Sequence, residues 1–241
     1  MGITHIFTLV AAVVALVYGD SISSVVNTKP LYFATFDNIT NVYENIGVLD
    51  EPVYFIPMSV TPKFCIGKYA VQTVFLNEQT VFNHIKLPIP VEVSPKSDGL
   101  TVCVDISEYI PGGIFASTSD NILYLYTDKD GNFYTAINET DSIDLDVNIY
   151  YYMDSDKFTT FCITNDNNNY RTLYVNGVHV SSVNAGPITK PFDIPYIGGN
   201  PMVKYGAVAH YIDNVIVYDY VASNVLETIS NIKVSNSCQY P

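Results

Sequence analysis

The chain has 241 residues and a formal net charge of −13, with 24 Asp and Glu against 11 Lys and Arg. Such a chain is repelled by phosphate backbones and by anionic lipid surfaces, so we predict no nucleic-acid partner. An apolar content of 48% supplies enough material for the core of a single domain.

The chain begins with an almost unbroken apolar run over residues 6–17, which is too short to span a bilayer but suits a secretory signal. Small residues at the −3 and −1 positions predict cleavage after residue 19, so residues 1–19 are predicted to be a signal peptide. An uncleaved anchor is the alternative, because only the amino terminus and His5 supply positive charge before the run. Cleavage would leave residues 20–241 as one secreted domain, with a core over about 31–230 and no membrane span.

Most of the remaining chain alternates Tyr, Val, Ile, Thr and Phe with polar residues, between turns of Asn, Asp, Gly and Pro. This pattern predicts strands and tight turns, and therefore an all-β sandwich or barrel. The predicted strands are residues 30–36, 68–76, 99–106, 113–118, 121–127, 132–138, 147–153, 158–165, 171–177, 178–183, 192–199 and 209–220. The polar, proline-containing stretch 89–100 is predicted to be a loop. Residues 222–232 are the one good short-helix candidate, with Ser223 as N-cap.

Two dipeptides, Asp130-Gly131 and Asn176-Gly177, carry the strongest signal for a type I′ turn, because both central residues of that turn need positive φ. A two-residue loop at the second pairs Val175 with Val178, Tyr174 with His179, and Leu173 with Val180. The valines and the leucine then share a buried face, and the tyrosine and histidine share a wet face. The preceding Asn165–Tyr170 is predicted to be a polar rim loop that is open as a contact surface.

Cysteines and sequons fit an oxidising compartment. The cysteines, Cys65, Cys103, Cys162 and Cys238, are too widely spaced for a zinc knuckle. In a secreted chain an even number predicts two disulfides, with three possible connectivities. Sequons at Asn38 and Asn138 predict one or two N-glycans at the surface.

Three blocks of sequence, in the right order, resemble the laminin-G-like, or concanavalin A-like, jelly-roll domains. "LYFATFDNITNVYENIG" resembles their opening strand, and "FTTFCITNDNNNYRTLYVNGVHVSSV" resembles a strand, a loop and a hairpin. "YIGGNP" followed by "AHYIDNVIVYDYVASNVLETI" resembles their closing block. The resemblance implies a two-sheet antiparallel jelly-roll sandwich with one short C-terminal helix.

The pentraxin branch of these domains offers a closer comparison. "LTVCVDI" and "FTTFCIT" resemble the two strands joined by the disulfide of that branch, which implies a Cys103–Cys162 bond and with it Cys65–Cys238. "SDNILYLY" resembles a segment whose Asp-Asn pair helps bind calcium, which maps to Asp120 and Asn121. In the other half of that site, "GGNPMVKYG" offers only Asn200 as a ligand. Calcium is therefore the candidate cofactor.

Catalytic patterns are weak in this sequence. The nearest match to the two-carboxylate pattern of glycoside hydrolases on this fold is "ETDSID", from Glu139 to Asp144, which ends in Asp where the pattern has Glu. The chain has no tryptophan to line a sugar subsite, and no histidine lies near a serine or cysteine motif. Twenty tyrosines could stack on sugars, but sequence singles out no subset. We therefore predict no catalytic residues.

The function expected from this resemblance is non-enzymatic recognition or adhesion, by binding a glycan or an extracellular protein. The first alternative is a structural or coat protein of an extracellular assembly, in which a tyrosine-rich face packs against copies of itself. A glycoside hydrolase of the same fold is the second alternative. Homo-oligomers are compatible with the first two.

Overall fold

The computed structural model describes most of the chain from residue 84 to residue 222 and parts of the chain before it. The described residues are 29–34, 36, 47–49, 52, 54–56, 63–65, 68–72, 84–118, 123–136, 141–154, 157–186, 191–200 and 206–222. The predicted signal peptide, both sequons, Cys238, and the predicted helix beyond Ala222 lie outside them.

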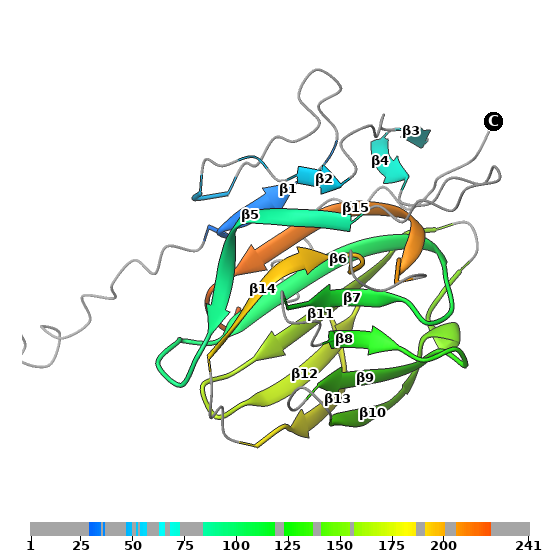
Figure 1. Ribbon diagram of the computed structural model, residues 1–241. Coiled ribbons are helices and arrows are strands. Elements are labelled where there is room, and N and C mark those ends of the chain that lie inside the picture. The colour runs from blue at the N-terminus through cyan, green and yellow to red at the C-terminus, as the bar shows by residue number, and fades with distance from the viewer. Residues whose placement is uncertain are drawn as a thin grey trace, which may run out of the picture.

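Two antiparallel sheets form a jelly-roll sandwich, as predicted (Figure 1). The first sheet has the order β13-β12-β11-β6-β15-β4-β3, and β1 also pairs with β15. Its strands are β1 (Tyr32–Ala34), β3 (Lys63–Cys65), β4 (Lys68–Gln72), β6 (Leu100–Tyr109), β11 (Thr159–Asn165), β12 (Tyr170–Val175), β13 (Val178–Asn184) and β15 (Ala209–Tyr218). The second sheet has the order β10-β9-β8-β7-β14-β5-β2. Its strands are β2 (Tyr54–Ile56), β5 (His84–Val93), β7 (Ile114–Ser117), β8 (Leu123–Thr127), β9 (Asn132–Ala136), β10 (Ser142–Asn148) and β14 (Phe192–Ile197).

The core lies between the two sheets and is built from alternate residues of each strand. Leu100, Val102, Val104 and Ile106 of β6 all belong to it, as the period of two of a β-strand requires. At its centre Phe115, Phe133 and Phe161 come from β7, β9 and β11, with ring centroids 5.1 to 5.5 Å apart. Because β11 belongs to the first sheet and the other two strands to the second, these rings join the sheets.

Strand β5 corrects the prediction of a loop over 89–100, since residues 89–93 belong to this strand. Pro88 and Pro90 argue against a strand in the sequence, because proline cannot donate a ladder hydrogen bond. The prolines lie where pairing with β14 is interrupted. There the Tyr32 hydroxyl takes the place of a neighbouring strand: it accepts from Ile89 N at 3.0 Å and donates to Ile89 O at 2.9 Å.

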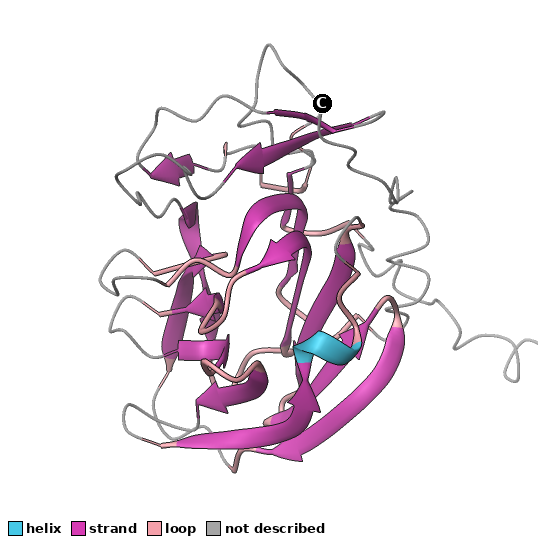
Figure 2. Cartoon of the chain, turned by 90° about the vertical axis from the view of Figure 1, so that its right-hand side faces the viewer, coloured by secondary structure: helices cyan, strands magenta, loops and turns pink. Residues whose placement is uncertain are grey.

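The predicted strand 147–153 is also corrected, because β10 ends at Asn148 and a 3₁₀ turn follows over Ile149–Tyr151 (Figure 2). The Asn148 side chain accepts a hydrogen bond from Tyr150 N at 3.0 Å, so it caps this turn. The alternation expected for this tyrosine run is therefore lost. No helix in the described parts of the chain is long and apolar enough to cross a membrane.

The Asn176-Gly177 hairpin has the predicted turn, with φ of 49° and 76° at its two central residues. The pairs Val175–Val178 and Tyr174–His179 are confirmed. The Leu173–Val180 pair is wrong, because a register shift between Leu173 and Tyr174 places Leu173 opposite Ser181. Val178 is also not buried: it is 63% exposed, since it begins the edge strand β13 beside the turn.

The Asp130-Gly131 hairpin is one residue longer than a type I′ loop. Only Gly131 has positive φ, at 84°, and its N–H donates to Asp128 O at 3.1 Å. Asp128 N donates in turn to Asn132 O at 3.0 Å, which closes a three-residue loop with a glycine bulge. The Asp128 carboxylate accepts from Asp130 N and Asn132 N, both at 2.9 Å, and fixes this turn. These hydrogen bonds hold the pKa of Asp128 below its usual value, although desolvation acts in the opposite direction.

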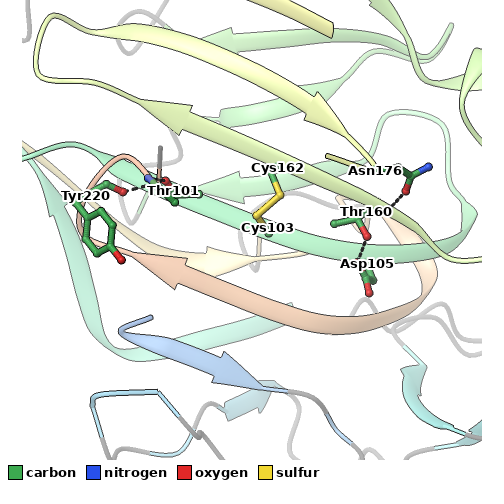
Figure 3. Close-up of a disulfide and its surroundings, with 8 residues drawn as sticks. Thr101, Cys103, Asp105, Thr160, Cys162, Asn176 and Tyr220 are labelled. Atoms are coloured by element: carbon green, nitrogen blue, oxygen red, sulfur yellow. Dashed lines mark hydrogen bonds between the residues drawn. A yellow bond between two sulfur atoms is a disulfide. The ribbon is translucent and has the colours of Figure 1, made fainter. Parts of the chain in front are cut away.

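The Cys103–Cys162 disulfide is confirmed and joins neighbouring strands β6 and β11 of the first sheet (Figure 3). It lies on the outer face of this sheet, in a small buried cluster with Ile216 and Tyr218. The sulfur pair has hydrogen-bonded neighbours: Asp105 accepts from Thr160 Oγ1 at 2.5 Å, and Thr160 N donates to Asn176 Oδ1 at 3.0 Å. The backbone of Cys65 ends β3, and its predicted partner lies outside the described residues.

Candidate functional site

Of the three predicted calcium ligands, only Asn200 lies within the described residues. Asp120 and Asn121 lie outside the described residues, and Asn200 follows β14 and is buried, with 3% of its surface exposed. Within the described part of the chain, no three His, Cys, Asp or Glu side chains form a group that could hold a metal ion. The calcium site stays a prediction.

The acidic segment that resembles a hydrolase pattern leads to the start of β10. Glu139 lies outside the described residues, Asp141 immediately precedes the strand, and Asp144 lies within it. Both described aspartates are exposed. They stand on the edge strand of the second sheet, next to β9.

A stacked pair of tyrosines lies beside this segment, on the outer face of the second sheet. Tyr126 of β8 and Tyr134 of β9 are directly opposed in the ladder, with ring centroids 5.5 Å apart and planes 22° from parallel. Both are half-buried, whereas their neighbours Thr127 and Phe133 are buried. The period of two of a β-strand therefore turns both rings outward. Figure 1 shows β8, β9 and β10 side by side.

Strand β10 adds polar groups to these rings. Tyr126 Oη donates to Ser142 Oγ at 3.0 Å, and Asp144 is the ladder partner of Tyr134. Because the two residues are directly opposed in the ladder, the Asp144 carboxylate raises the pKa of Tyr134, chiefly by its charge. We call Tyr126, Tyr134, Ser142 and Asp144 together the tyrosine face. It combines two half-buried aromatic rings, both turned outward, with a carboxylate and a hydroxyl.

A second group of tyrosines lies at one end of the sandwich. Tyr150, Tyr151 and Tyr152 of the 3₁₀ segment are 52%, 86% and 37% exposed. The Tyr150 ring packs edge-on against Tyr109, at a centroid distance of 5.4 Å. Burial raises the pKa of Tyr109 to about 12, and its hydroxyl pairs with Thr127 Oγ1 at 2.6 Å. This group is a second patch of exposed aromatic surface.

The predicted rim loop before β12 is mostly a structural turn. The Asp166 carboxylate accepts from Asn168 N at 2.9 Å and from Tyr170 N at 2.7 Å. Asn169 is buried and donates to Gly186 O at 2.5 Å. Asn167 and Asn168 at the tip of the loop and Tyr170 at its end are exposed, so these residues are open as a contact surface.

His84 is a buried histidine in β5 that is not part of the tyrosine face. Its ring packs edge-on against Tyr196, with centroids 5.2 Å apart. Among the described residues its Nε2 has no hydrogen-bond partner. Burial, and secondarily the charge of Lys86, lower the pKa of His84 to about 4.

This burial predicts a pH dependence of stability. Between pH 6.5 and pH 4, His84 is protonated in the unfolded chain but stays neutral in the folded chain. The free energy of unfolding therefore falls as the pH is lowered through that window. The contribution is about 2 kcal/mol after allowance for solvent screening. Urea unfolding at pH 7.5 and pH 4.5 measures it. His84→Gln should lessen the loss, whereas His179→Gln, at an exposed position, should not. Equal losses in all three proteins would contradict this assignment.

Comparisons with known proteins agree with the fold. A family model described as the Concanavalin A-like lectin/glucanases superfamily matches residues 84–224. No curated protein matches the chain. Among solved structures, domain 4 of AbnA, a GH43 extracellular arabinanase from Geobacillus stearothermophilus in complex with arabinotriose, is 15% identical, with a TM-score of 0.56. The match covers 83% of this chain and 97% of that domain.

Botulinum neurotoxin structures are similar to the same degree. A structure of type C, whose cell entry depends on interaction with two ganglioside molecules, is 12% identical with a TM-score of 0.56, over 86% of this chain and 52% of that chain. The binding domain of type DC, in complex with rat synaptotagmin II, is 9% identical with a TM-score of 0.53, over 85% of this chain and 52% of that chain. The chain thus spans about half the length of these neighbours. At such identities the likeness shows the fold alone.

Proposed function

The chain belongs to the concanavalin A-like lectin/glucanase superfamily, and on that premise we propose that it is a secreted, non-enzymatic recognition module that binds an extracellular glycan. The tyrosine face is the observation that carries this proposal. The predicted signal peptide and the disulfide support secretion, because disulfides persist in oxidising compartments. Neighbouring structures of the same fold include domains solved with a sugar or a receptor, which is consistent with recognition.

The chemistry of the tyrosine face suits a sugar. A pyranose or furanose ring has an apolar face of C–H groups, which packs on aromatic rings, and a rim of hydroxyls that need hydrogen-bond partners. Tyr126 and Tyr134 supply the rings. Asp144 accepts hydrogen bonds from hydroxyls. The Ser142 hydroxyl accepts from Tyr126, which leaves its own proton available to a ligand. An outward sheet face can bind an extended chain.

Removal of either aromatic ring should weaken this binding. On a glycan array, Tyr126→Ala and Tyr134→Ala should each lower affinity for the glycans bound by the wild-type chain about 30-fold, or about 2 kcal/mol. Tyr126→Phe and Tyr134→Phe keep the rings and should lose less. Tyr151→Ala is the matched control, because it removes an 86% exposed tyrosine at the end of the sandwich. Titration calorimetry of the purified proteins gives the affinities.

Other outcomes of this experiment would overturn parts of the proposal. Unchanged binding by both alanine variants would place the site elsewhere. Silence on the array together with self-association in light scattering would favour a structural or coat protein, and binding of an extracellular protein alone would favour a protein receptor. Release of reducing sugar from a bound glycan would overturn the non-enzymatic function. A chelator arm tests calcium: loss of binding in EDTA would support the predicted metal site.

A further inference from the structure

The surroundings of the tyrosine face are negatively charged. Strand β10 carries Asp144 and Asp146, and Asp141 immediately precedes it; all three are exposed. Asp144 stands against Tyr134, whose pKa is raised first by this carboxylate and further by Asp128. Carboxylates from both β10 and the β8–β9 turn therefore contribute to the electrostatic potential at the outward-facing rings of Tyr126 and Tyr134.

Cations that could offset this charge are missing from the same strands. The sequences of β8, β9 and β10 contain no Lys or Arg. Lys129, in the turn between β8 and β9, is paired with Asp130 at 2.8 Å. On the same sheet Lys86 belongs to β5, toward the opposite end of the strand order, and the single arginine, Arg171, is buried in the core.

From this charge distribution we propose that the tyrosine face binds sugar chains without negative charge and rejects uronic-acid, sulfated and other anionic sugars. The inference rests on the proposed function and names the ligand class of that same site. Recognition of carboxylate or sulfate groups needs Arg or Lys donors, which these strands do not supply. An anionic sugar would instead bring its charge within a few ångströms of Asp144, where repulsion is screened only in part.

Asp144 has two roles in this arrangement. Its carboxylate has acceptors only, so it suits the hydroxyls of a neutral sugar and repels acidic groups. Its Oδ1 already accepts from Asp146 N at 2.8 Å, which holds the carboxylate in position. Asp144→Asn keeps an oxygen at this place and removes the charge. This variant therefore tests whether the charge of Asp144, and not the shape of the binding face, selects neutral over anionic sugars.

The test uses two oligosaccharides that differ only in one acidic group, such as a neutral hexose chain and its uronic-acid counterpart. The full secreted chain should bind the neutral member at least 10-fold more tightly at 20 mM NaCl, which corresponds to about 1.4 kcal/mol. The ratio of the two affinities should fall at 500 mM NaCl, because salt screens exposed charges. Asp144→Asn should lower the ratio several-fold. Asp193→Asn, an equal charge change at an exposed residue of β14, should leave it unchanged.

The outcomes are distinguishable. Equal or tighter binding of the acidic member, lost in Tyr134→Ala, would overturn the charge inference and leave the glycan-binding function standing. A preference for the neutral oligosaccharide that changes neither with salt nor in Asp144→Asn would also overturn the charge inference. The shape of the binding face, and not its charge, would then select the sugar. No binding of either member, after a positive control lectin binds both, would remove the proposed function and this inference with it.

Discussion

Removal of the Cys103–Cys162 disulfide, by Cys103→Ala together with Cys162→Ala, is expected to lower the free energy of unfolding by about 4 kcal/mol. The two cysteines are 59 residues apart in the sequence, so the bond closes a long loop and restricts the unfolded chain. Both half-cystines are fully buried on the outer face of the first sheet. Alanine at both positions therefore also loses packing against Ile216 and Tyr218.

Urea unfolding followed by tyrosine fluorescence measures this loss. The double variant is the better test than a reducing agent, because a reductant would also open any second disulfide. Glycan binding by the folded variant should persist, since the bond lies on the first sheet and the tyrosine face on the second. A loss below about 1 kcal/mol would show that the bond restricts the unfolded chain much less than the length of its loop predicts.

Arg171→Ala is expected to destabilise the fold by about 4 kcal/mol. The Arg171 side chain is buried, with 1% exposed, and its guanidinium crosses from β12 to the second sheet. Nη1 donates to Thr135 Oγ1 at 2.5 Å and to Ala136 O, and Nε donates to Asn165 Oδ1 at 3.2 Å. Removal of the donors would leave these buried acceptors unpaired, at a cost of about 1–3 kcal/mol each.

The charge of Arg171 is not neutralised by a carboxylate, since neither ion pair of the described residues includes it. Its guanidinium carbon lies 4.6 Å from the centroid of the buried Tyr124 ring, so a cation–π contact takes the place of an ion pair. Desolvation lowers the pKa of Arg171, whereas burial raises that of Tyr124 to about 12. Tyr124 therefore stays protonated at neutral pH.

A lysine variant separates the contribution of the Arg171 hydrogen-bond donors to stability from the contribution of its charge. Arg171→Lys keeps a cation but cannot donate in several fixed directions, so it should still lose about 2 kcal/mol in urea unfolding. Lys157→Ala is the control, because the exposed Lys157–Asp154 pair at 2.8 Å should contribute less than about 1 kcal/mol. An alanine variant as stable as the wild-type chain would mean that water can replace the guanidinium.

Local sequence was sufficient to predict most strands, because alternation and turn residues are local signals. The prediction failed where a hydrogen bond with a residue distant in the sequence decides the backbone conformation. The prolines of β5 are tolerated because the Tyr32 hydroxyl, 57 residues away, pairs with both backbone groups of Ile89. The tyrosine run after β10 becomes a 3₁₀ turn because Asn148 caps it, and Asn148 itself donates to Asp130 O at 2.9 Å.

The candidate site depends on the length of the turn between β8 and β9, which is one residue longer than a type I′ loop. A type I′ loop at Asp130-Gly131 would pair Tyr134 with Thr127 and send Tyr126 and Tyr134 to opposite faces of the sheet. The observed three-residue loop pairs the two tyrosines with each other. The carboxylate of Asp128 fixes the longer turn. This residue is visible in the sequence, but local sequence does not show that its hydrogen bonds outweigh the preference of Asp130-Gly131 for a type I′ turn.

The fold class, the turn at Asn176-Gly177 and, through resemblance, the Cys103–Cys162 bond could all be predicted before the structure was known. These depend on periodicity, on the positive φ that Asn and Gly tolerate, and on ordered blocks of family sequence. The burial of the single arginine, and the stacking of Tyr126 on Tyr134 among the described tyrosines, became visible only in the tertiary structure. Burial and strand register depend on contacts between distant segments, which a local pattern does not contain.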